Sequence, residues 1–165
     1  MIKIENVTVD RDEKMVRAEI VAPPYWWIQY KVLTDDAIGA TDTTELSFIQ
    51  HFIYKDFTMN DVCERDIFED ATAAKIESLN ELRRRFFAVK GKDKDCISER
   101  MSIIRQAELT LPLTYMAFGR ITLNYSKLSE IFESKSGDLL GEWIEFCSWV
   151  KTLPDSETLI FNKGE

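Results

Sequence analysis

Residues 111–128 read LPLTYMAFGRITLNYSKL, and this stretch decides the fold because it joins a strand to a helix through one corner. Apolar residues alternate with other residues from position 115 to 124, which predicts a β-strand. Both faces of that strand are largely apolar, so the pattern places it in the middle of a sheet. Asn124 or Ser126 can then cap a helix that closes near Gly137, since each side chain offers an acceptor to unpaired amides.

Comparable patterns predict the other elements. Residues 2–9 and 14–22 alternate apolar and polar residues on either side of a DRDE turn, which predicts a β-hairpin. Residues 25–33, YWWIQYKVL, fit a buried strand or a short helix equally well. Helical periodicity predicts further helices from Thr44 onward and over residues 71–89, 95–107 and 138–152. We therefore expect one α+β domain over residues 1–165, with a mostly antiparallel sheet and about five helices.

The composition is that of an ordinary globular chain, with 45% hydrophobic and 30% charged residues. Cys63, Cys96 and Cys147 lie far apart and form no C-x-x-C pair, which is typical of free thiols in a reducing compartment. The N-terminus lacks the pattern of a signal peptide, and no apolar run is long enough to span a membrane. We therefore expect a cytoplasmic protein that does not enter a membrane.

The negative charge of the chain is concentrated in one segment. Residues 35–70 hold ten acidic residues and only two basic ones, Lys55 and Arg65, while the remaining 19 acidic and 19 basic residues cancel. This segment therefore carries the whole net charge of −8. Such clustering serves solubility or forms a surface that docks on a basic partner. The residues expected to form that surface are Asp35, Asp36, Asp56, Asp61, Glu64, Asp66, Glu69 and Asp70.

The sequence contains no recognisable catalytic or metal-binding motif. His51 is the only histidine and falls in an amphipathic helix, which favours a structural or surface role. A zinc site would need a cluster of Cys or His ligands, and the three cysteines show no such spacing near His51. Neither of the phosphate-binding motifs G-x-x-x-x-G-K and G-x-G-x-x-G occurs. Adjacent acids such as Glu69-Asp70 could hold Mg²⁺, but such pairs are common on solvated loops. We assign no catalytic residue and expect no metal and no cofactor.

Residues 111–144 resemble the C-terminal part of flavin-dependent thymidylate synthases. Members of that family carry a Leu-Pro-Leu, an aromatic strand, a Thr-x-Asn and a helix that ends in arginine. The matching pieces lie in the C-terminal third of the chain and are Leu111-Pro112-Leu113, the strand 115–121, Thr122-Leu123-Asn124, Leu128, Phe132 and Trp143-Ile144.

The resemblance implies a nucleotide site at the corner led by Asn124. Asn124 and Lys135 stand where the family binds its nucleotide, and Arg120 would help to position phosphate, with FAD as the cofactor. Lysine in place of the family's arginine keeps the charge but loses the bidentate fork. The family's Arg-His-Arg signature is missing from residues 30–48, where Lys31 is the only basic residue among four carboxylates. The resemblance therefore implies a degenerate scaffold that has lost flavin chemistry.

Two functions of different classes follow. The first is a non-catalytic acidic interaction or inhibitor protein, which docks on a basic, nucleic-acid-binding protein such as a host defence nuclease and does not bind nucleic acid itself. The second is a synthase-like enzyme that binds a nucleotide through Asn124, Lys135, Arg120 and Lys31. A purely structural homo-oligomer is a third alternative, because the synthases are tetramers. The motif APPYWW, with Trp143, Phe146 and Trp149, also resembles uncharacterised phage and mobile-element proteins, a likeness that implies no activity.

Overall fold

The computed structural model describes residues 2–34, 44–63, 69–112 and 114–161, which form an α+β fold around a three-stranded antiparallel sheet. These residues include six α-helices and two short helical segments, more than the five or so helices expected. The difference arises mainly at residues 25–33, whose aromatic run shows no clear periodicity. It forms α1 (Pro24–Thr34), because Pro24 has the backbone φ of a first helical residue and needs no amide partner there.

The sheet has the order β1 (Lys3–Asp10), β2 (Met15–Ala22) and β3 (Ala117–Asn124). The predicted N-terminal hairpin is thus confirmed, but β2 is the central strand and β3 lies at an edge. The expectation that β3 is central was wrong, because only one of its faces is buried. Ala117, Gly119, Ile121 and Leu123 face the core, whereas Phe118 and Arg120 are exposed.

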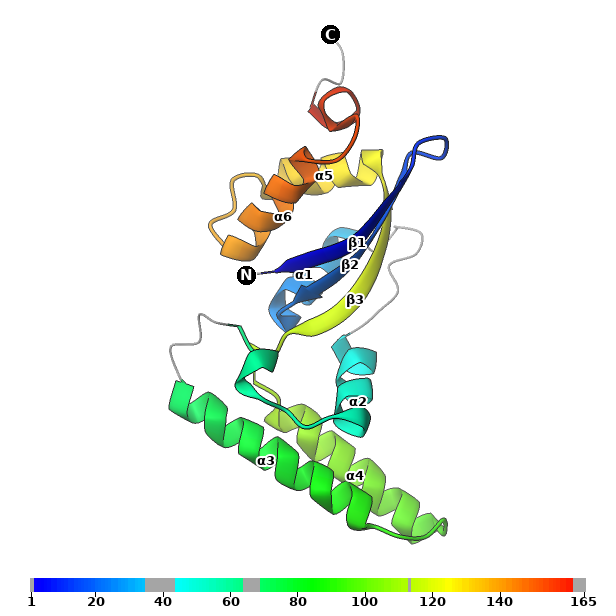
Figure 1. Ribbon diagram of the computed structural model, residues 1–165, viewed down its shortest axis with the longest axis vertical. Helices are drawn as coiled ribbons and strands as arrows, with labels where there is room; N and C mark the ends of the chain where they lie inside the picture. Colours follow the sequence, from blue (N-terminus) through cyan, green and yellow to red (C-terminus); the bar gives the residue numbers. More distant parts are fainter. Residues whose placement is uncertain (1, 35–43, 64–68, 113, 162–165) are drawn as a thin grey trace.

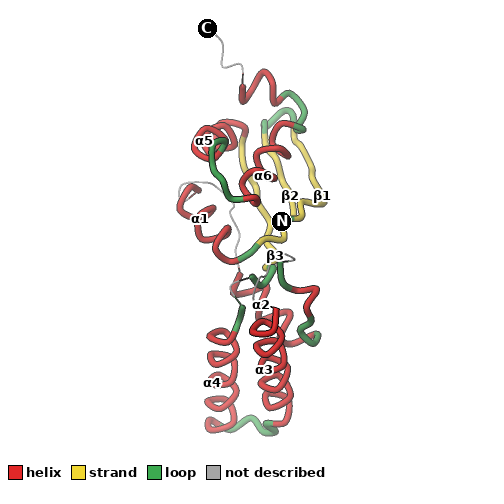
Figure 2. The backbone as a smooth tube through the Cα atoms, turned by 90° about the vertical axis from the view of Figure 1, so that its left-hand side faces the viewer, coloured by secondary structure: helices red, strands yellow, loops and turns green. Residues whose placement is uncertain are grey.

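Three helices cover one face of the sheet. Figure 2 shows α1, α5 (Tyr125–Lys135) and α6 (Gly141–Lys151) on the same side of the strands. The helix and the sheet pack closely at Gly119, where a Cβ atom would lie 2.5 Å from the ring of Trp27. The indole Nε1 of Trp27 also donates a hydrogen bond to the carbonyl oxygen of Ala117 over 3.0 Å. These contacts fix α1 across β3.

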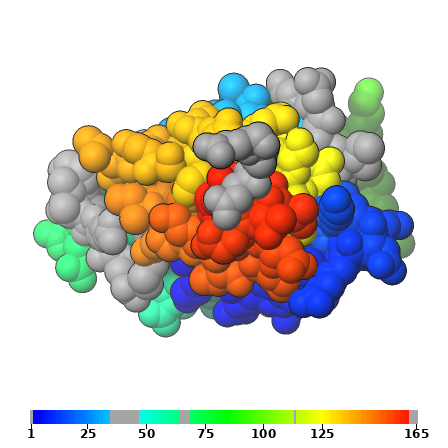
Figure 3. All heavy atoms as spheres, turned by 90° about the horizontal axis from the view of Figure 1, so that it is seen from above, coloured from blue at the N-terminus to red at the C-terminus, as the bar shows by residue number. Residues whose placement is uncertain are grey.

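Asn124 caps α5, as the sequence predicts. Its side-chain oxygen accepts a hydrogen bond from the amide of Lys127 over 2.7 Å, which satisfies one of the unpaired amides of the first turn. The chain then runs through α5 and α6 to the π-helical segment η2 (Glu157–Phe161). In the view from above (Figure 3), η2 lies over α5 and α6 beside the β1–β2 turn.

The other half of the molecule is helical. α2 (Thr44–Tyr54) contacts β3, and a loop with the 3-10 turn η1 (Met59–Asp61) leads toward a hairpin of α3 (Glu69–Ala88) and α4 (Lys94–Thr110) (Figure 1). Arg83 of α3 holds α2 in place, because its guanidinium donates to two carbonyl oxygens at the C-terminal end of α2. Among the described residues, no helix is both long and apolar enough to cross a membrane.

Candidate functional site

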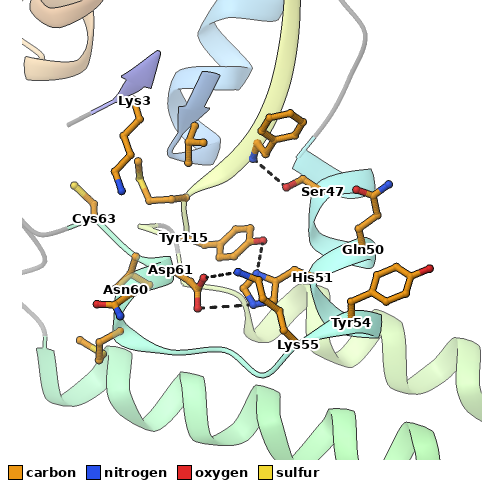
Figure 4. Close-up of a pocket in the computed structure, with 15 residues that line it drawn as sticks. Lys3, Ser47, Gln50, His51, Tyr54, Lys55, Asn60, Asp61, Cys63 and Tyr115 are labelled. Carbon is orange, nitrogen blue, oxygen red and sulfur yellow. Dashed lines mark hydrogen bonds and ion pairs between the residues drawn. The ribbon is translucent and has the colours of Figure 1, made fainter. Parts of the chain in front are cut away.

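An open pocket of about 730 Å³ lies where the sheet meets the helical half of the molecule (Figure 4). Ten of its fifteen lining residues come from residues 47–63, which form α2, the loop after it and η1. The remaining lining residues come from β1, β2 and the chain that enters β3. A concave site of this size is large enough for a small molecule or for a side chain of a partner protein.

The loop that forms the floor of the pocket is fixed by local hydrogen bonds. Thr58 and Asp61 make a reciprocal capping box around η1, in which each side chain accepts from a backbone amide at the other end of the turn. Two longer-range bonds then join the loop to the segment before β3. The amide of Cys63 donates to the carbonyl of Thr114, and the amide of Met116 donates to the carbonyl of Asp61, each over 2.8 Å.

His51 lies at the centre of a polar network on the floor of the pocket. Its ring stacks on Phe57 with centroids 4.1 Å apart, and only 8% of the residue is exposed. Nδ1 lies 3.1 Å from the hydroxyl of Tyr115, and Nε2 lies 3.3 Å from the carbonyl oxygen of Asp56. A carboxylate oxygen of Asp61 is 3.7 Å from the same Nε2. Figure 4 shows Tyr115, His51 and Asp61 next to one another at the pocket floor.

The partners of His51 determine its tautomer. Both groups beside Nε2 are acceptors, so this nitrogen carries the hydrogen of the neutral ring. Nδ1 is then an acceptor, and the hydroxyl of Tyr115 must donate to it. Tyr115, His51 and Asp61 therefore form a network in which the hydroxyl of Tyr115 donates to His51 and the Nε2–H group of His51 faces the carboxylate of Asp61.

Burial sets the protonation states of this network. It lowers the pKa of His51 and raises the pKa of Tyr115 to about 12, because it disfavours the charged form of each group. Burial alone would raise the pKa of Asp61, but hydrogen bonds from Thr58 and Lys55 hold it below its usual value. At neutral pH the network thus contains a neutral imidazole, a protonated phenol and a carboxylate. This combination stabilises the structure, but it does not activate the phenol as a nucleophile.

Several polar groups around the pocket remain available to a ligand. The side chains of Lys3, Gln50, Tyr54 and Asn60 line it and have no hydrogen bond or ion pair within the described part of the chain. Lys55 instead pairs with Asp61 over 3.2 Å. No three His, Cys, Asp or Glu side chains of the described residues lie close enough together to hold a metal ion. The arrangement can bind a polar group.

The residues assigned to a nucleotide site do not gather around this pocket. Asn124 serves as the cap of α5, and Arg120 pairs with Glu19 over 2.9 Å on the open face of the sheet. Arg120 lies about 13 Å from Asn124 along the strand. Lys135 lies at the far end of α5, about 16 Å from Asn124 along the helix. Lys31 is exposed near the end of α1.

Lys135 already has a full set of partners. Its ammonium group donates to Gln29 over 3.0 Å and to Asp138 over 2.9 Å, and it lies 5.0 Å from the ring centre of Trp143. Gln29 in turn accepts from the indole nitrogen of Trp143 over 2.7 Å. This arrangement joins α1, α5 and α6, so Lys135 has a structural role whether or not it meets a ligand.

The acidic residues of the expected docking surface divide into three groups. Asp56 and Asp61 are paired inside the molecule, with Arg83 over 2.7 Å and with Lys55 over 3.2 Å respectively. Glu69 and Asp70 are exposed in the first turn of α3, where negative charge suits the helix dipole. The other four, Asp35, Asp36, Glu64 and Asp66, lie outside the described residues.

The Tyr115–His51–Asp61 network could not be identified from the sequence. The structural role expected for His51 agrees with its burial, but its partners are 10 and 64 positions away in a chain with no local motif between them. The bridge between Val62 and Tyr115 that brings them together is a single long-range pair with no periodic signal. Comparisons with protein-family models, curated proteins and solved structures found no match to this chain, so the reading of the site depends on its own geometry.

Proposed function

We propose that this chain is a non-catalytic interaction protein that docks an acidic surface on a basic protein partner, on a scaffold related to the flavin-dependent thymidylate synthases. The observation that carries the proposal is the confinement of the whole net charge of −8 to residues 35–70. The partner class is a cytoplasmic nucleic-acid-binding protein, such as a host defence nuclease, whose groove presents a basic surface to phosphates.

The positions of the described acids refine this surface. Asp56 and Asp61 each face a basic side chain of the same molecule, so their charge is largely compensated. Glu69 and Asp70 have no ion pair with another described residue and face solvent at the start of α3. We therefore place the docking surface at the start of α3 rather than on the pocket floor.

The proposed mechanism is electrostatic competition. A cluster of carboxylates can occupy a groove that is built for phosphates, and it accelerates encounter with a basic partner over distances of about 8 Å at physiological salt. Complementary charge contributes mainly to the association rate and to selectivity. Binding should therefore weaken as salt rises, and duplex DNA should compete for the same groove.

The test is a pull-down from host lysate with immobilised protein, eluted in parallel by salt and by duplex DNA. We expect nucleic-acid-binding proteins in both eluates, and we expect their loss with the double variant Glu69→Lys/Asp70→Lys. The matched control is Asp12→Lys/Glu13→Lys, which changes the net charge equally on an exposed turn outside the acidic segment. Retention that resists both salt and DNA, or equal loss with the control pair, would refute the proposal.

A second candidate function is supported by the open pocket. Its free polar side chains favour a small polar ligand, as the synthase-like alternative requires, although none of Asn124, Lys135, Arg120 and Lys31 lines it. Under this alternative the purified protein is yellow with FAD, or dUMP raises its melting temperature. A colourless protein whose melting temperature does not respond to dUMP would remove this candidate.

A further inference from the structure

α4 carries a second stripe of side chains that the fold does not bury. The stripe that faces α3 includes the buried residues Ile103 and Ala107. The second stripe is offset from the first by one residue, which is about 100° around the helix, and its members are spaced alternately by three and four residues. Its members are Lys94, Ile97, Met101, Ile104 and Glu108. This is the heptad spacing with which one helix packs along another.

Two of the three apolar residues at the centre of this stripe are open to solvent. Ile97 is 52% exposed and Met101 is 50% exposed, whereas Ile104 is half-buried against the core. Exposed apolar residues that share one helix face mark an interaction site more often than scattered ones do.

The two charged ends of the stripe are unfavourable for α4 itself. Lys94 is the first residue of the helix and Glu108 lies in its last turn, so each charge opposes the helix dipole at its own end. Both side chains are exposed and make no ion pair with another described residue. Their placement therefore gains nothing from the isolated helix, whereas a second helix of opposite direction would reverse both interactions.

We propose that this face of α4 binds the same face of a second copy of the chain, antiparallel and about a two-fold axis beside Met101. The order Ile97, Met101, Ile104 is nearly the same in both directions along the helix. An isologous contact, in which the same patch of two subunits meets, requires this symmetry. Ile97 then lies level with Ile104 of the partner subunit, and Met101 packs on Met101 of the partner subunit. Lys94 lies level with Glu108 of the partner subunit and beside the negative end of its helix dipole.

A parallel pairing is disfavoured by the same residues. It would set Lys94 against Lys94 of the partner subunit and Glu108 against Glu108 of the partner subunit, and like charges at such positions repel. A single helix pair buries less than the roughly 1,600 Å² of a standard stable interface, so the dimer should be reversible and depend on concentration. The contact uses none of residues 35–70, so it stands or fails independently of the proposed docking function.

Sedimentation measurements over a wide concentration range test the contact directly. We expect the wild-type chain to shift from its monomer mass of 19.2 kDa toward twice that mass as concentration rises. Met101→Asp should abolish the shift, because it sets two carboxylates side by side at the axis. Leu109→Asp, at a more exposed position (88%) on the same helix but off the stripe, should leave it intact. A monomeric wild type, or equal loss with both variants while helicity is retained, overturns the proposal.

Charge exchange tests the direction of the pairing. Lys94→Glu and Glu108→Lys should each weaken the dimer, and the double exchange should restore it, since opposite charges again face each other. In a Cys96→Ser background, Met101→Cys should form an intermolecular disulfide under mild oxidation, whereas Lys94→Cys should not. Preferred cross-linking through position 94, or a double exchange as weak as the single ones, would exclude the antiparallel arrangement.

Discussion

The hydroxyl of Tyr115 donates a hydrogen bond to Nδ1 of His51 over 3.1 Å, and this bond joins the helical half of the molecule to the entrance of the sheet. Only 2% of Tyr115 is exposed, so solvent is a poor substitute partner for the phenol. The bond therefore stabilises the fold and also shapes the floor of the pocket.

Loss of this hydrogen bond should be measurable as a loss of stability. Tyr115→Phe removes the donor and leaves Nδ1 of a buried imidazole unpaired, which costs roughly 1–3 kcal/mol. We expect the free energy of unfolding in urea to fall by this amount, with little change in the far-ultraviolet spectrum. Tyr54→Phe is the matched control, since Tyr54 is 80% exposed and should be neutral. Equal stability of the two variants would contradict the directed network.

Acid should destabilise the protein through His51. Burial lowers the folded-state pKa of His51 below its ordinary value of 6.5, so the folded chain binds a proton less readily than the unfolded chain. The contribution of His51 is therefore complete above about pH 6.5 and is lost as pH falls below that value. Because the chain has one histidine, few other groups titrate in this range.

The free energy of unfolding, measured between about pH 7.5 and about pH 5.5, tests this sign. We expect it to fall with pH in the wild type and to stay nearly level in His51→Gln, which cannot take up a proton. A wild-type free energy that rises toward acid would show that the charge of Asp61 outweighs burial at this site.

Gly119 should tolerate no side chain. A Cβ atom there would lie 2.5 Å from the ring of Trp27, which is itself held by a hydrogen bond to Ala117. Gly119→Ala should therefore destabilise the protein by about 1–3 kcal/mol through overpacking. Gly137→Ala is the control, since a Cβ there meets nothing within 4 Å. Thermal unfolding of both variants decides the point, and a neutral Gly119→Ala would contradict the close packing of α1 on β3.

The elements that local patterns define could be predicted from the sequence, whereas their neighbours in space could not. The hairpin of β1 and β2, the long helix α3 and the cap at Asn124 each follow from side chains within a few residues of one another. The edge position of β3 does not, because Phe118 makes its exposed face look apolar. The pocket depends on a contact between residues 62 and 115, and no periodic pattern in the sequence near either residue predicts that contact.

Arg83 and Arg84 are neighbours in sequence but should differ in their contribution to stability. The guanidinium of Arg83 donates to the carbonyls of Phe52 and Ile53 and to a carboxylate oxygen of Asp56, so it satisfies the end of α2 through a forked geometry. Arg83→Lys keeps the charge but cannot reach all three acceptors. We expect it to lower the free energy of unfolding by about 1–2 kcal/mol, since buried carbonyls lose their donors.

Arg84→Lys provides the matched control for that change. Its side chain is 60% exposed and pairs only with Glu77 and Glu81 on the surface of α3, an interaction that lysine can also make. Urea unfolding of the two variants should therefore separate them clearly. If Arg84→Lys proved as destabilising as Arg83→Lys, the loss would reflect the packing or propensity of α3, and the anchoring of α2 by Arg83 would be refuted.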